Sequence, residues 1–330
     1  MDAWGRVRRT IEAARATEQA SEDDLRVVRL SIEANVAIDY YELRETDQEI
    51  AVLDRMSKDL QQSVELTQSL FEHGLNSDLR VAQAKTLLEQ TDASEQSLKT
   101  QREQFEHALA VLLGRTPESF QLPSESGPPV PPVIPVGLPS DLLKRRPDIA
   151  EADRNVAAAT ARIGVAKASY FPQPSLTGAA GYESSNVASL LNWQNTIASL
   201  VGSATAPIFT AGRLRAGVDQ AQAVYRESLA QYEQAVLVSY QQVEDQLSAL
   251  HYLSTKSELQ NLAVQDATRS EQIATDQYKR GLVSYLDVVT AQQSVLFNKR
   301  AATQISGQRL VASVVLIEAL GGGWEQTKTP

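Results

Sequence analysis

Apolar residues recur every seven positions along a long stretch near the start of the chain. Residues 6–73 contain neither glycine nor proline, the two residues that most often end a helix. One seven-residue period has Ser57 as its only polar member, and a companion period carries two leucines. The apolar members of these periods are Val36, Leu43, Ile50, Val64, Phe71, Leu53 and Leu60. Because a sustained seven-residue repeat is typical of a coiled-coil seam, we predict one helix, on the order of 100 Å long, that packs laterally against partner helices.

A second stretch without glycine or proline follows directly. It runs from Leu75 to Leu113 and is separated from the first by Gly74. This spacing predicts a tight turn and a shorter return helix, which together form a helical hairpin within a first structural repeat at residues 1–121. Residues 122–146 are rich in proline and are predicted to be an extended linker.

The second half of the chain predicts a helix, a pair of strands and another long hairpin. Pro147 suits the first turn of a helix, and segments rich in glycine, alanine, serine and threonine then predict a β-hairpin at 175–206. Residues 218–280 again lack glycine and proline, and Gly281 separates them from a return helix. The seam of the helix that starts at Pro147 consists of Ile149, Val156 and Ile163.

The two helical hairpins are one unit that occurs twice, 207 positions apart. Three pairs of glycines mark the same points in each copy: Gly5 and Gly212, Gly74 and Gly281, Gly114 and Gly321. A constant offset without gaps indicates a duplication. We therefore assign residues 147–323 to a second structural repeat and 324–330 to a flexible tail. The first repeat lacks the helix and the complete β-hairpin of the second, so we expect the natural chain to contain further residues before Met1.

Composition and charge exclude several classes of function. The 330 residues carry a formal charge of −10 with a pI of about 5.0, which offers no basic groove for nucleic acid. The absence of cysteine excludes disulfides, thiolate metal sites and cysteine nucleophiles. The three histidines are scattered, and no phosphate-binding loop or serine nucleophile motif occurs. We expect neither an enzyme nor a cofactor or metal site, and no apolar run reaches the roughly 18–20 residues of a spanning helix.

Six segments spread over the chain resemble a known family. These segments are Trp4–Arg8, Leu138–Ile149, Tyr170–Pro172, Ala206–Leu214, Arg280–Asp287 and Glu318–Trp324. They resemble the TolC-like outer-membrane factors, in particular the lipoprotein branch (NodT/OprM-like) that serves resistance-nodulation-division (RND) multidrug efflux systems. This branch carries a signal peptide and a lipid-modified cysteine ahead of its first repeat, and residues 1–330 leave the presence of a lipid anchor open.

The resemblance implies a mainly α fold with a small β part. Each protomer would supply duplicated long helical hairpins to a coiled-coil α-barrel, and four strands to the transmembrane β-barrel of a homotrimer. The partners implied are a periplasmic adaptor (membrane fusion) protein, an inner-membrane RND pump and outer-membrane lipid. The implied function is that of a passive exit duct in the outer membrane that extends into the periplasm.

Two other functions remain open on the sequence. The first is the outer-membrane duct of a protein-secretion system, although residues 145–149 resemble the efflux branch more closely. The second is a soluble coiled-coil scaffold, which would explain the seven-residue repeats and the charge. A scaffold would not explain the β-hairpin at 175–206 or the duplication.

The turns of the two helical hairpins are the first candidate site. The resemblance implies that they form the periplasmic tip where the adaptor docks; the plainer interpretation is a glycine cap and turn. The docking candidates are Gly74, Leu75, Asn76, Ser77, Gly281, Leu282, Val283 and Ser284. The candidates for a gate that narrows the channel are Arg80, Asp287 and Tyr285, of which the first two occupy equivalent positions in the repeats with opposite charge. Their plainer interpretation is a pair of solvated helix charges.

The segments at the strand ends are the second candidate site. Arginines follow closely on aromatic residues there, which is typical of a membrane boundary, where aromatic rings lie at headgroup level and guanidinium groups meet lipid phosphates. The candidates are Trp4, Arg6, Arg8, Phe209, Arg213 and Arg215. The alternative is ordinary surface charge at the start of two helices.

Overall fold

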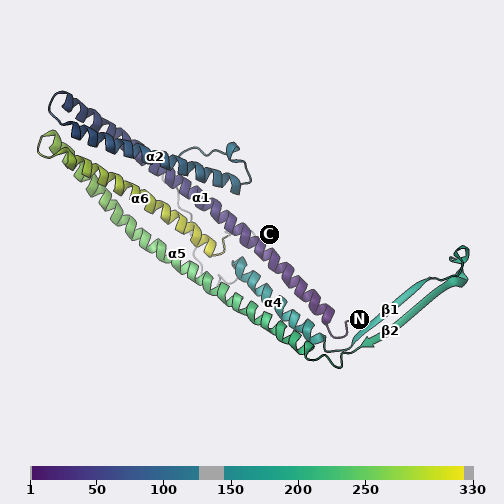
Figure 1. Cartoon of the computed structure of the whole chain (residues 1–330). Coiled ribbons are helices and arrows are strands. Elements are labelled where there is room, and N and C mark those ends of the chain that lie inside the picture. Colours follow the sequence, from purple (N-terminus) through teal and green to yellow (C-terminus); the bar gives the residue numbers. More distant parts are fainter. Residues whose placement is uncertain (1, 126–144, 323–330) are drawn as a thin grey trace, which may run out of the picture. The chain divides into compact units, whose positions relative to one another are not determined.

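The computed structural model describes residues 2–125 and 145–322, most of which lie in long helices (Figure 1). The first hairpin consists of α1 (Arg6–Glu72) and α2 (Asp78–Leu112), and the second of α5 (Arg213–Lys279) and α6 (Tyr285–Ala319). The remaining elements are η1 (Pro117–Ser119), α4 (Pro147–Ala168), β1 (Gln173–Tyr182), η2 (Val187–Ser189), η3 (Trp193–Asn195) and β2 (Thr196–Thr205). Most of the predicted linker, residues 126–144, and the predicted tail, residues 324–330, lie outside the described residues.

The helices of the two hairpins have matching lengths. Both long helices contain 67 residues and both return helices contain 35. The long helices begin 207 residues apart (213 − 6), and so do the return helices (285 − 78). The expectation of duplicated long helical hairpins with a small β part is confirmed. The boundaries of the structural repeats at residues 121, 146 and 323 stay predictions.

The chain divides into two compact units, and each unit combines segments of both repeats. The strand unit comprises Met1–Val27 and Leu143–Val238. The hairpin unit comprises Val28–Leu142 and Ser239–Pro330. Helices α1 and α5 therefore each contribute residues to both units.

In the strand unit, small residues allow α1 and α4 to approach closely. The Arg9 side chain lies against Gly164, where an added Cβ would come within 3.1 Å of it. In the predicted seam of α4, Ile149 is buried and Val156 and Ile163 are half-buried. Within the strand unit, the buried alanines of the two helices are Ala13, Ala16, Ala20, Ala158, Ala159, Ala161 and Ala168.

The strand unit also contains the predicted β-hairpin. Strands β1 and β2 pair in antiparallel register over ten residues each, from Gln173 opposite Thr205 to Tyr182 opposite Thr196. Side chains of successive residues point to opposite faces of a strand. One face therefore presents Leu176, Ala180, Tyr182, Ala198 and Leu200, while the other presents several serine and threonine hydroxyls, including Ser175, whose Oγ lies 2.7 Å from that of Ser203.

The hairpin unit has its main apolar cluster near the turns. The buried members come from all four helices of the two hairpins: Met56, Leu60, Val64, Ala84, Leu87, Ala274, Tyr285, Val288 and Val289. Of the predicted seven-residue seam, Leu43, Leu53, Leu60 and Val64 are buried, and Val36 and Ile50 are half-buried. Phe71 is 40% exposed, so the seam leaves the core within the last turn of α1.

None of the described helices combines the length and the apolar character needed to cross a membrane.

Candidate functional site

The turns between the long and return helices have the same geometry in both repeats. Gly74 and Gly281 adopt positive φ angles of 71° and 73°, a backbone conformation that glycine adopts without steric cost. The N–H of the next residue then donates to a carbonyl five residues back, from Leu75 to Leu70 at 2.8 Å and from Leu282 to Gln277 at 2.9 Å. The glycine N–H groups also donate, from Gly74 to the Phe71 carbonyl and from Gly281 to the Tyr278 carbonyl. The two bonds at each turn form a Schellman motif, which satisfies the last carbonyls of each long helix.

The return helices begin differently in the two repeats. Ser284 caps α6 through a capping box in which the Asp287 carboxylate accepts hydrogen bonds from the Ser284 N–H (2.9 Å) and hydroxyl (2.8 Å). Ser77 occupies the equivalent position at α2 but makes no side-chain capping bond. The residue that matches Asp287 there is Arg80 (287 − 80 = 207), which cannot accept such bonds.

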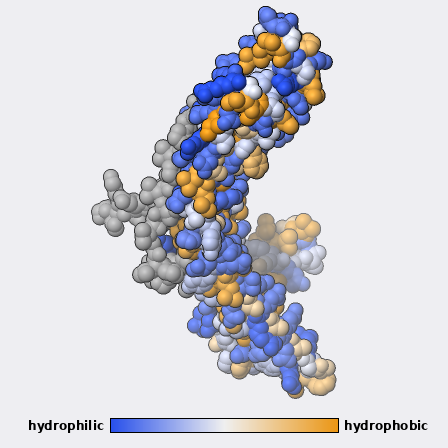
Figure 2. Space-filling model, turned by 90° about the vertical axis from the view of Figure 1, so that its left-hand side faces the viewer, coloured by the Kyte–Doolittle hydropathy of each residue, from blue (hydrophilic) through white to orange (hydrophobic). Residues whose placement is uncertain are grey.

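Apolar side chains are exposed at both turns. Leu75 is 73% exposed and its counterpart Leu282 is 69% exposed, although leucine is normally a core residue. One turn into the return helices, Leu79 and Leu286 are also exposed. Figure 2, viewed from the side on which the turns lie in Figure 1, shows hydrophobic patches among hydrophilic residues over this face. Exposed apolar side chains beside polar ones are typical of a surface that meets a partner.

The three gate candidates occupy different environments. Tyr285 is 2% exposed and belongs to the main apolar cluster, with its ring centroid 5.3 Å from that of Tyr278. Burial, together with the neighbouring Tyr278, raises the pKa of Tyr285 to about 12. Asp287 is exposed and Arg80 is half-exposed, and no ion pair joins these two side chains in the described protomer. Tyr285 thus packs inside the protomer, while Asp287, which caps α6, and Arg80 lie at its surface.

At the start of the chain, Trp4 is fixed to the end of α4. Its ring stacks on Phe171 with centroids 4.8 Å apart, and its indole N–H donates to the Pro172 carbonyl at 2.6 Å. Asp2 caps α1 by accepting from the Val7 N–H at 2.9 Å, and it pairs with the exposed Arg8 at 3.1 Å. The aromatic and basic candidates of the first repeat therefore lie on a fixed scaffold.

The corresponding residues before α5 are more exposed. Phe209 is 89% exposed and makes no aromatic contact within the described ranges. Arg6 and Arg213 are exposed, and Arg215 lies 3.9 Å from Asp219 in a solvent-exposed pair.

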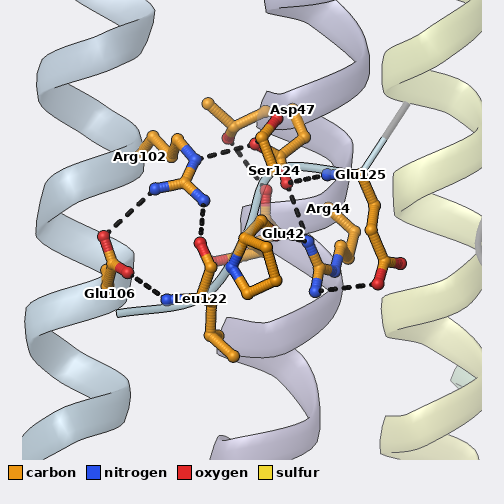
Figure 3. Close-up of polar contacts among 10 residues, drawn as sticks. Glu42, Arg44, Asp47, Arg102, Glu106, Leu122, Ser124 and Glu125 are labelled. Atoms are coloured by element: carbon orange, nitrogen blue, oxygen red, sulfur yellow. Dashed lines mark hydrogen bonds and ion pairs between the residues drawn. The ribbon is translucent and has the colours of Figure 1, made fainter. Parts of the chain in front are cut away.

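A buried polar cluster in the hairpin unit was not among the sequence candidates. Asp47 on α1 is fully buried and accepts from Arg44 at 3.0 Å and from Arg102 on α2 at 2.7 Å (Figure 3). Arg102 also pairs with Glu106 at 3.1 Å. In the second repeat, His251 and Ser254 stand at the positions of Arg44 and Asp47, so the cluster is specific to the first repeat.

This cluster holds the chain that leaves α2. The Ser124 hydroxyl and the Glu125 N–H donate to the Asp47 carboxylate, at 3.0 and 3.3 Å. Arg102 donates to the Leu122 carbonyl at 2.6 Å, and the Leu122 N–H donates to the Glu106 carboxylate. Figure 3 shows the segment passing between these side chains. The signal in the sequence was the run of charges at 42–49 within an otherwise apolar seam, which required a partner from elsewhere in the chain.

No group of three or more histidine, cysteine or acidic side chains that could hold a metal ion occurs in residues 2–125 and 145–322.

Comparison with known proteins identifies the family. The sequence profile described as "Outer membrane efflux protein" matches residues 1–115 and 138–322. The cation efflux system protein CusC of Escherichia coli O6:H1 is 31% identical over 329 residues, which cover 99% of this chain and 71% of CusC. The solvent efflux pump outer membrane protein SrpC of Pseudomonas putida is 33% identical over 327 residues, 98% of this chain and 69% of SrpC. The solved structure of the outer-membrane channel OprN superposes with a TM-score of 0.92 at 30% identity and covers 98% of this chain and 73% of OprN. Long duplicated hairpins, a strand pair and these similarities agree, and the chain belongs to the outer membrane efflux protein family.

Proposed function

We propose that the protein is the outer-membrane exit duct of a tripartite efflux system and works as a homotrimer. Its partners in this proposal are a periplasmic adaptor and an inner-membrane RND pump. The observation that carries the proposal is the pair of identically built hairpin turns, each with an exposed leucine beside a glycine cap, in a chain of the efflux family. The relatives are named for different exported substances, cations for CusC and solvents for SrpC, so the proposal specifies no substrate.

The turns are proposed to receive the adaptor. An apolar side chain that protrudes from a rigid turn can bury its surface in a partner with little loss of conformational freedom. Both turns offer this at matched positions, Leu75 and Leu282. At the second turn, Val283 is half-buried and Ser284 caps the start of α6.

The gate is proposed to involve Asp287 and Arg80. In a homotrimer, three copies of each charged side chain would stand around one axis, and like charges placed close together need compensation. Opposite charges at equivalent positions of the two repeats could supply it between neighbouring protomers. Exposed pairs of this kind contribute only about 0–1 kcal/mol each, so binding of an adaptor would suffice to break them.

The strand ends are proposed to meet the lipid headgroups. The aromatic residues Trp4 and Phe209 and the arginines that follow them support this placement. Fractionation of host membranes should recover the native protein with the outer membrane, and recovery in the soluble fraction would contradict the proposal.

Substitution of the turn leucines tests the docking proposal directly. Leu282→Asp and Leu75→Asp change exposed side chains, so the amount of folded trimer should stay at the wild-type level. Accumulation of a fluorescent efflux substrate in cells should rise to the level of a deletion strain, and crosslinking to the adaptor should fall. The control is Gln101→Asp, which adds the same charge at an exposed position of α2 far from the turn. Normal efflux and normal crosslinking in both leucine variants would contradict docking at the turns.

A further inference from the structure

The half-buried Glu45 of α1 meets α6 at a point where α6 has no side chain. A Cβ added at the buried Gly307 would overlap the carboxylate of Glu45. Gly307 lies well inside α6, where glycine is less favourable than alanine for a helix. Its presence there is explained by the space that the Glu45 side chain occupies.

The surroundings of Glu45 are rich in negative charge. Glu42 and Glu49 lie about one turn away on either side of it along α1. From α6, Arg300 reaches this region, but its guanidinium donates to Glu49, with both N–O distances at 3.1 Å. Arg44, the preceding residue of α1, is bound to Asp47 and Glu125. No ion pair reaches Glu45 from any other described residue.

This environment favours the neutral form of the carboxyl group. Burial, followed by the charges of Glu49 and Glu42, raises the pKa of Glu45 to about 8. Burial and the nearby Asp39 also raise the pKa of Glu42. The raised pKa favours the protonated form of the Glu45 side chain at neutral pH, and in that form it can lie against the backbone of α6 without an unpaired charge.

We propose that the contact between Glu45 and Gly307 is a proton-dependent contact between α1 and α6. With a proton on Glu45, the two helices pack closely. Loss of the proton places a further negative charge beside Glu49, where no cation of residues 2–125 and 145–322 forms an ion pair with Glu45, and the packing of α1 against α6 weakens. This inference concerns the folded protomer and does not rest on the proposed export function.

The pH dependence of unfolding tests the charge part of the proposal. The folded pKa of Glu45 lies above the ordinary value of 4.5, so between these values the folded protein holds one proton more than the unfolded protein. The stabilisation that comes from the Glu45 proton is complete when the pH is below 4.5, and it is lost as the pH rises towards about 8. Over this range Glu45 should increase the unfolding equilibrium constant by up to about tenfold per pH unit.

The variant Glu45→Gln isolates this effect in the native protein in detergent, because its amide has a similar size and stays neutral. Its unfolding constant, followed by circular dichroism in urea, should lose the part of the pH dependence that Glu45 contributes. The matched control Glu89→Gln, at an exposed position of α2, should keep the wild-type dependence. An identical dependence in wild type and Glu45→Gln would overturn the proposal.

A second pair of variants tests the geometry without reference to pH. Gly307→Ala should lower the unfolding midpoint in the wild-type background, because its Cβ overlaps the Glu45 carboxylate. In a Glu45→Ala background the same change should lose most of its effect, or raise the midpoint, because alanine favours the helix. An equal decrease of the unfolding midpoint in both backgrounds would mean that Gly307 does not make room for the Glu45 side chain, and the proposal would fail.

Discussion

Among single residues of the hairpin unit, Asp47 accepts hydrogen bonds from four partners: Arg44, Arg102, Ser124 and Glu125. It is fully buried and pairs with both Arg44 and Arg102, each of which has one further carboxylate partner, Glu125 and Glu106 respectively. We expect Asp47→Ala to lower the free energy of unfolding by about 3–5 kcal/mol, because it removes the buried carboxylate that two arginines and the donors of Ser124 and Glu125 share. Urea unfolding of the native protein measures this loss. The control Asp54→Ala removes an exposed i,i+4 pair with Lys58 and should cost only about 0–1 kcal/mol; similar losses for the two variants would show that the buried cluster has no special weight.

Alanine substitutions at two glycines of the second repeat should change the stability of the protein in opposite directions. Gly281→Ala forces a Cβ into a left-handed conformation and should destabilise the protein by about 1–2 kcal/mol. Gly217 lies inside helix α5 with open space around it, so Gly217→Ala should stabilise the protein by about 0.5–1 kcal/mol. Thermal unfolding compares the two variants, and a shift of the same sign in both would contradict the assigned role of the turn glycine.

Among the elements, the two return helices provide a matched comparison of helix starts. Ser284→Ala removes the capping box of α6 and should cost about 0.5–2 kcal/mol. Ser77→Ala, at the equivalent position of α2, removes a side chain that makes no capping bond and should have little effect. Hydrogen exchange of the first-turn amides reports each helix start separately. Equal loss of protection in both helices would show that the capping box contributes nothing.

The long helices and their turns could be predicted from the sequence because their signals are local. The glycine-free and proline-free stretches and the repeated glycines placed the ends of α1 and α5 within a few residues. The buried positions Leu43, Leu53 and Leu60 followed from the seven-residue period. The exposure of Phe71 did not follow from this period, since the core near the turns is built from residues of all four hairpin helices.

The polar clusters could not be predicted because their members are distant in sequence. Asp47 is satisfied by Arg102 and by the segment at 122–125, and nothing local to Asp47 points to them. Likewise, the exposed Leu286 and the buried Tyr285 are neighbours in the sequence, and only the packing of α6 against the other helices distinguishes them. The gate candidate Tyr285 is buried in the main apolar cluster of the protomer, and its part in a gate stays a prediction.

On the scale of the whole molecule, the gate proposal predicts a change in conductance. Asp287→Asn removes the charge but keeps an oxygen that can accept the two bonds from Ser284, so α6 should stay capped. Together with Arg80→Gln it should raise the single-channel conductance of the native protein in planar bilayers without a lower unfolding temperature. The control is Ser284→Ala, which keeps both charges. A conductance unaltered by either charge variant, alone or combined, would place the constriction elsewhere.

The equal helix lengths of the two hairpins restrict how such a protein can change in evolution. Each added residue rotates the following part of a helix by about 100°, so an insertion in α1 alone would turn its buried face away from the cluster near the turns. An insertion of seven residues, about two full turns, restores the face but shifts the turn along the axis unless α2, α5 and α6 lengthen as well. The length of the hairpins would therefore change only when all four helices change together. In related sequences, insertions or deletions in one repeat should be matched by others 207 positions away, in the numbering of this chain.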